Sequence, residues 1–145
     1  GELPVQFGGD VVVYGVERNR AVVAAGDGEA ARREADLLAR EPAYGNIAEM
    51  GLGVLAGFGV QPCGEVLLDE KLGLHVAFGR SDHFGGQIGP GDFTRPEAVV
   101  HIDRVYLPGT QPRIRVERLD LAMPDGAPVP VMRDGVYVVA FGPRP

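Results

Sequence analysis

The sequence has only one cysteine, Cys63, and this scarcity excludes an internal disulfide. A lone cysteine of this kind is typical of a reduced structural thiol in an intracellular protein, so we expect a cytoplasmic location. No apolar run reaches the ~18 residues of a membrane span, and no secretory signal is visible. With a net charge of −6 and no basic cluster, the chain also lacks the footprint of a nucleic-acid-binding protein.

The composition suits one globular domain over residues 1–145. Hydrophobic residues make up 45% of the chain and charged residues 23%, both ordinary values. The 22 glycines and 12 prolines favour a turn-rich, strand-rich fold over a helical bundle. The first residue is Gly1 instead of methionine, which is typical of a processed product or of a fragment from a longer protein.

Periodicity predicts an α+β fold, with a mixed, mostly antiparallel sheet of about seven strands and one main helix. Residues 10–16 and 20–25 are predicted to form a hairpin with a four-residue loop. The helix is expected over residues 29–40, with Asp27 as its N-cap and Pro42 as its stop. Further extended segments are expected at residues 46–55, 69–79, 99–103, 113–121, 128–132 and 136–141.

A histidine interrupts the apolar pattern of the strand around residue 75. Because successive side chains of a strand point to opposite faces, His75 shares its face with Gly73, Ala77 and Gly79. The histidine therefore projects from a face that is kept free of bulk. The opposite face carries the apolar side chains of Leu72, Leu74, Val76 and Phe78.

Two other strands carry similar polar side chains. His101 and Asp103 are two residues apart and share a face, and Glu49 shares its face with Gly51 and Gly53. Imidazole and carboxylate groups suit zinc, cobalt, manganese or iron(II), and two histidines with one carboxylate also match a non-haem iron site. The residues alone leave two interpretations open, a metal site and a set of hydrogen-bonded structural side chains.

Four motifs in fixed order carry a family resemblance. They are Asn-Ile-Ala-Glu-Met-Gly-Leu-Gly at 46–53, Leu-Asp-Glu-Lys at 68–71 leading to His-Val-Ala-Phe-Gly at 75–79, Phe-Gly-Gly at 84–86, and Val-His-Ile-Asp at 100–103. In order and spacing the chain resembles the aminopeptidase T family of metallopeptidases and its 2,5-dihydroxypyridine 5,6-dioxygenase-like relatives. Members of both groups are much longer, and the resemblance covers only their metal-bearing C-terminal half.

The resemblance implies that Glu49, His75, His101 and Asp103 are metal ligands, and that Glu2 stands where the family uses a further upstream glutamate. In the peptidases, a pair of divalent ions such as zinc, cobalt or manganese clamps a carbonyl and generates a hydroxide near neutral pH. In the dioxygenase branch, a similar set would hold one iron(II). The resemblance also implies a homodimer.

Several polar residues near these strands have two interpretations each. His83 follows a ligand-bearing strand and could contact substrate or act as an acid or base, or it could be an exposed loop residue. Asp82 could orient His83, and Arg80 could bind a substrate carboxylate. Glu70, with its neighbours in the Asp-Glu-Lys run, could hydrogen-bond a ligating histidine or lie in a solvated turn.

The function that these residues and the resemblance favour is metal-dependent, aminopeptidase-like hydrolysis of an amide bond in a small molecule or short peptide. One alternative is an iron(II) ring-cleaving dioxygenase of the dihydroxypyridine type. Another is a non-catalytic domain that keeps the fold for assembly or for binding a small ligand.

Overall fold

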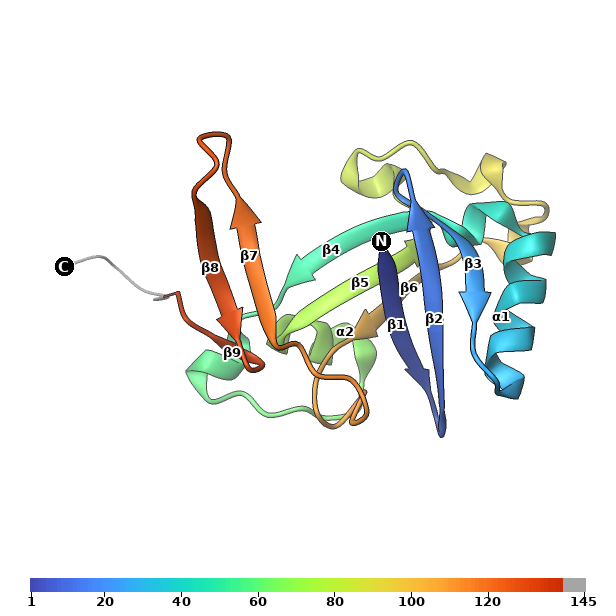
Figure 1. The fold of residues 1–145 in the computed structure, drawn as a ribbon. Coiled ribbons are helices and arrows are strands. Elements are labelled where there is room, and N and C mark those ends of the chain that lie inside the picture. Colours follow the sequence, from blue (N-terminus) through green and yellow to red (C-terminus); the bar gives the residue numbers. More distant parts are fainter. Residues whose placement is uncertain (140–145) are drawn as a thin grey trace.

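The computed structural model describes residues 1–139, whose strands form three separate three-stranded antiparallel sheets (Figure 1). Their orders are β1-β2-β3, β4-β5-β6 and β7-β8-β9. Two α-helices accompany them in this part of the chain. The elements are β1 (Glu2–Phe7), β2 (Asp10–Glu17), β3 (Arg20–Ala25), α1 (Glu29–Arg40), β4 (Ile47–Leu52), α2 (Val66–Asp69), β5 (Leu74–Gly79), β6 (His101–Val105), β7 (Arg118–Ala122), β8 (Pro128–Arg133) and β9 (Val136–Tyr137).

The prediction of one mixed sheet of about seven strands is wrong, although the fold is α+β in the broad sense. Each strand pairs with its neighbours in the chain, so every sheet is a local meander. Helix α1 separates the first meander from the second, and residues 106–117 separate the second from the third. Alternation predicts strands but does not say which strands share an edge, and this is why the number of sheets was missed.

Several predicted strands have other bounds in the structure. β1 was missed, and its Pro4 is tolerated because β1 is an edge strand of its sheet. The strand expected at 69–79 begins only at Leu74, because residues 66–72 form helical turns, and the strand expected at 113–121 begins only at Arg118. Of the strand expected at 136–141, the structure shows Val136–Tyr137, and the segment 140–141 lies outside the described residues.

The hairpin between β2 and β3 closes with a two-residue turn instead of the expected four-residue loop. Arg18 and Asn19 both have positive φ, 48° and 64°, as tight hairpin turns require. The Asn19 amide also donates to the Ile47 carbonyl at 2.8 Å, and the Ile47 N–H donates to the Asn19 carbonyl at 3.0 Å. The turn therefore fixes the start of β4 against the first sheet.

Helix α1 has the bounds that the periodicity predicts, but its cap is not Asp27. Gly28 is the N-cap residue and supplies no side-chain hydrogen bond. Asp10, at the start of β2, accepts a hydrogen bond from the Ala30 N–H at 3.1 Å instead. A Cβ at Gly28 would overlap this carboxylate, so glycine at that position lets a residue distant in sequence satisfy the helix end.

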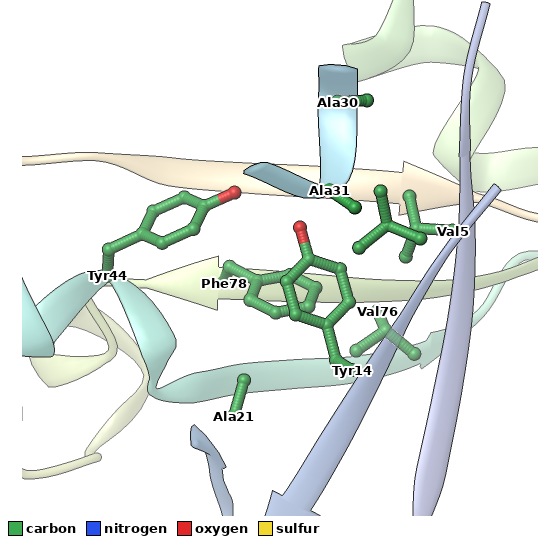
Figure 2. Packing of buried hydrophobic residues seen from close by; sticks show 9 residues of the cluster. Val5, Tyr14, Ala21, Ala30, Ala31, Tyr44, Val76 and Phe78 are labelled. Carbon is green, nitrogen blue, oxygen red and sulfur yellow. The ribbon is translucent and has the colours of Figure 1, made fainter. Parts of the chain in front are cut away.

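The core lies between the first sheet, α1 and one face of the second sheet (Figure 2). The Phe78 ring packs against Tyr14, with centroids 5.0 Å apart, and against Tyr44 at 5.8 Å. Buried Glu34 accepts hydrogen bonds from the Tyr14 hydroxyl at 2.8 Å and from the Tyr44 hydroxyl at 2.7 Å. The face of β5 that bears Phe78 is thus held in the core, which leaves its other face for polar side chains.

The third sheet stands beside the second, and a cavity of about 710 Å³ lies next to it. Leu72, Tyr106, Met132 and Tyr137 are among its lining residues, and the predicted metal ligands are not. Within residues 1–139, no helix has both the length and the apolar character needed to cross a bilayer.

The reassigned helix cap gives a test of the fold. Asp10→Ala removes the acceptor for the first turn of α1, so the free energy of unfolding should fall by about 1 kcal/mol in urea denaturation. Asp27→Ala is the matched control and should change it by less than about 0.5 kcal/mol. A loss confined to the Asp27 variant would contradict the assignment of Asp10 as the cap.

Candidate metal centre

The pairing of the second sheet places three of the predicted ligands on one face. Glu49 on β4 lies opposite Ala77 on β5, and Ala77 lies opposite Asp103 on β6. Gly51 on β4 lies opposite His75. Since opposite residues of an antiparallel pair point to the same side, these side chains meet over Ala77. Ligand atoms of Glu49, His75 and Asp103 all lie within 4.8 Å of one another.

His75 is buried and held in one orientation. Its Nδ1 lies 3.2 Å from the Gly73 carbonyl oxygen, and its Nε2 lies 3.3 Å from Glu49 Oε1. A carbonyl oxygen can only accept, so Nδ1 donates and carries the hydrogen. Its Nε2 then points to the Glu49 carboxylate, where it could act as a ligand, which is the usual arrangement of a metal-binding histidine.

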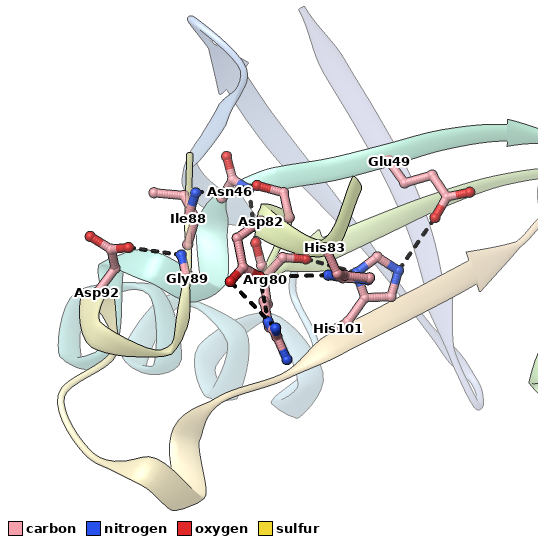
Figure 3. A network of polar contacts seen from close by, with 11 residues as sticks. Asn46, Glu49, Arg80, Asp82, His83, Ile88, Gly89, Asp92 and His101 are labelled. Carbon is pink, nitrogen blue, oxygen red and sulfur yellow. Dashed lines mark hydrogen bonds and ion pairs between the residues drawn. The ribbon is translucent and has the colours of Figure 1, made fainter. Parts of the chain in front are cut away.

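His101 is oriented in the same way, as Figure 3 shows. Its Nδ1 donates to the Arg80 carbonyl at 2.8 Å. Its Nε2 lies 3.4 Å from Glu49 Oε2 and 3.8 Å from Asp103 Oδ1. The Glu49 carboxylate therefore presents one oxygen to each imidazole, and His101 joins the group of three.

The donor set fits a divalent cation. Two atoms that each lie about 2.1 Å from a tetrahedral zinc are about 3.4 Å apart, which matches the separations between Glu49 and the two imidazoles. Asp103 Oδ1 is buried and has no hydrogen-bond partner among the described residues. A Cβ at Gly51 would overlap the His75 ring. Glycine at position 51 thus makes room for the His75 ring beside Glu49 and Asp103.

A third carboxylate, Glu70, adds to the negative charge here. Burial and the neighbouring Glu70 carboxylate raise the pKa of Asp103. Burial acts on Glu70 in the same direction, but hydrogen bonds with Lys71 and Asp103 outweigh it and hold the pKa of Glu70 below its usual range. The Lys71 ammonium pairs with Glu70 and compensates its charge.

The sequence left Glu70 with two interpretations, and the structure places it beside the candidate ligands. Residues Glu70–Leu72 form a 3₁₀ turn immediately before β5, and Glu70 is buried. Glu70 shares a hydrogen bond with Asp103 and interacts electrostatically with His75. Strand alternation could not reveal this contact, because Glu70 precedes the strand and reaches the site through the turn.

His83 lies at the edge of the group. Its ring meets the His101 ring edge-on, with centroids 4.9 Å apart, and its Nδ1 lies 3.7 Å from Asp82 Oδ1. Asp82 also accepts hydrogen bonds from Arg80, and these bonds lower the pKa of Asp82. Arg80 is therefore paired within its own loop instead of standing free for a substrate carboxylate.

Glu2 is not brought into the group. It lies on β1 of the first sheet, opposite Gly15, and is exposed. Among residues 1–139, the cluster that could hold a metal ion consists of Glu49, His75 and Asp103, with His101 in contact with two of them.

Comparison with known proteins gives one informative likeness. No family model and no curated protein matches the chain. A solved structure of wild-type AmpT from Thermus thermophilus is similar in fold, with a TM-score of 0.52 and 24% sequence identity. The match covers 94% of this chain and 35% of AmpT, so the chain spans about a third of that protein's length. At this identity the likeness establishes the fold alone.

The close contact between Gly51 and the His75 ring gives a test of the site. Gly51→Ala places a methyl group against the His75 imidazole, so zinc affinity in a competition titration with a chromophoric chelator should fall about 10-fold or more. Gly57→Ala is the control, since a Cβ there meets nothing within 4 Å and affinity should be unchanged. Equal zinc affinity in wild type and Gly51→Ala would contradict the site.

Proposed function

We propose that this chain is the metal-binding part of an aminopeptidase-like hydrolase that cleaves an amide bond in a small molecule or short peptide. The observation that carries the proposal is the Glu49 carboxylate, whose two oxygens face the Nε2 atoms of His75 and His101 at 3.3 and 3.4 Å. The fold likeness to AmpT, an aminopeptidase T, supports the same activity. The match to only 35% of AmpT makes the substrate and the rest of the cleft part of the proposal.

The residues suit a pair of divalent ions. His75, Glu49 and Asp103 would hold one ion, and His101 together with Glu49 would hold the other. Glu70 supplies a further oxygen donor beside them. Nitrogen and oxygen donors of this kind suit zinc, cobalt or manganese. When bound, such a pair would polarise an amide carbonyl and lower the pKa of water toward neutrality.

The protein's own groups would then position the substrate and move a proton. His83 stands beside His101 at the edge of the group with its side chain 35% exposed, so it can reach a bound substrate. We assign it the role of general acid or base, to carry the proton that the leaving amine needs. The expected homodimer and cytoplasmic location stay predictions.

A second candidate function uses the same side chains. His75, His101 and one carboxylate make the two-histidine, one-carboxylate set of non-haem iron(II) enzymes. An iron(II) ring-cleaving dioxygenase would therefore need one ion and oxygen, where the hydrolase needs two ions and water. Metal stoichiometry separates the two functions.

If the chain is a metal-dependent hydrolase, variants of the metal ligands should lose metal binding and activity together. The wild type should bind up to about two equivalents of zinc, cobalt or manganese and cleave aminoacyl p-nitroanilides. His75→Ala and Glu49→Gln should each lower metal affinity by more than about 10-fold and reduce cleavage to background. Glu17→Gln, at an exposed glutamate of β2, is the control and should behave as wild type.

Two outcomes would contradict the proposed hydrolase function. One is cleavage that persists in both variants, or after chelation of the metal. The other is one equivalent of iron with oxygen uptake on a dihydroxypyridine, which would establish the dioxygenase instead.

The role of His83 can be tested apart from metal binding. His83→Gln should lower kcat by about 100-fold, since it removes a proton-transfer group, while metal affinity stays at the wild-type value. Steady-state kinetics and a zinc titration on the same preparation give both numbers. If His83→Gln loses zinc as His75→Ala does, then His83 is a ligand and the assignment is wrong.

A further inference from the structure

An exposed aromatic ring lies directly beside the candidate metal centre. The Phe84 ring centroid is 4.3 Å from that of His83 and 5.7 Å from that of His101. Phe84 is nevertheless 63% exposed. Single exposed apolar side chains are common on proteins, so its exposure alone carries no meaning. Its contact with a candidate ligand and with the candidate acid or base sets it apart.

The loop that carries Phe84 holds the ring in place. The Phe84 N–H donates to the Ser81 carbonyl at 3.0 Å, and the Gly86 N–H donates to the same oxygen at 2.9 Å. Gly85 has φ +81°, which closes the turn at little cost for glycine. Buried Ser81 is held in turn by Asn46 at the start of β4. A tight turn, anchored to the second sheet, therefore presents Phe84 to solvent.

We propose that Phe84 and His83 form the wall that receives an apolar side chain of the substrate beside the amide bond to be cleaved. This inference rests on the proposed hydrolase function. Arg80, on the same loop, is paired with Asp82, so it is not free to receive an acidic side chain. An aromatic face in these surroundings favours apolar groups, whose burial releases water.

The test uses two hydroxamates, because these probes bind a metal centre without being turned over. On zinc-loaded wild-type protein, calorimetry should show L-leucine hydroxamate binding about 10-fold more tightly than glycine hydroxamate. Phe84→Ala should reduce this preference below about 2-fold, and Phe84→Leu should retain most of it because it restores an apolar surface.

Phe58→Ala is the matched control. Phe58 is 65% exposed, like Phe84, but lies in the turn Leu55–Phe58 after β4, so its variant should keep the wild-type preference. An unchanged preference in Phe84→Ala would overturn the inference, as would an equal loss in Phe58→Ala.

The experiments distinguish failure of this inference from failure of the proposed hydrolase function. If the wild type binds zinc and cleaves p-nitroanilides, and Phe84→Ala keeps the wild-type preference, then only the proposed role of Phe84 is refuted. Wild-type protein that holds zinc but binds neither hydroxamate refutes both proposals. A preference for glycine hydroxamate over the leucine probe also refutes the wall.

Discussion

The pairing of β5 with its two neighbours is the constraint on which the rest of the structure depends. Phe78 is held in the core between Tyr14 and Tyr44, and this packing fixes which face of β5 points outward. A slip of one residue would turn His75 into the core and expose Phe78. The same register sets Glu49 and Asp103 on either side of Ala77. The packing of the core and the geometry of the site therefore depend on the same register of β5.

The site itself breaks an ordinary rule of stable proteins. Buried acceptors normally have donors, yet Asp103 Oδ1 has none among the described residues, and the Nε2 atoms of two histidines face the same carboxylate. Lys71 pairs directly with Glu70 and interacts with Glu49 and Asp103 through its charge alone. Bound divalent cations would satisfy these lone pairs. Such local conflicts in an otherwise consistent fold are typical of functional sites.

Side chains that share one face of a sheet were easier to predict than the division into sheets. Strand alternation is a local property, so it placed His75, His101 with Asp103, and Glu49 on faces free of bulk, and the structure brings these residues together. Contacts between segments distant in sequence were not predictable in this way. Alternation could not show that the strands divide into three meanders or that Asp10 caps α1. Glu70 was ambiguous because a 3₁₀ turn, and no strand, carries it to the site.

The central claim is that the outward face of the second sheet binds a divalent ion. Anomalous diffraction at the zinc edge from crystals soaked in zinc tests it most directly. The account predicts a peak about 2.0–2.2 Å from Nε2 of His75 and from a Glu49 oxygen, with a second peak beside Nε2 of His101. A map with no peak on this face, or with zinc bound only elsewhere on the protein, would contradict it.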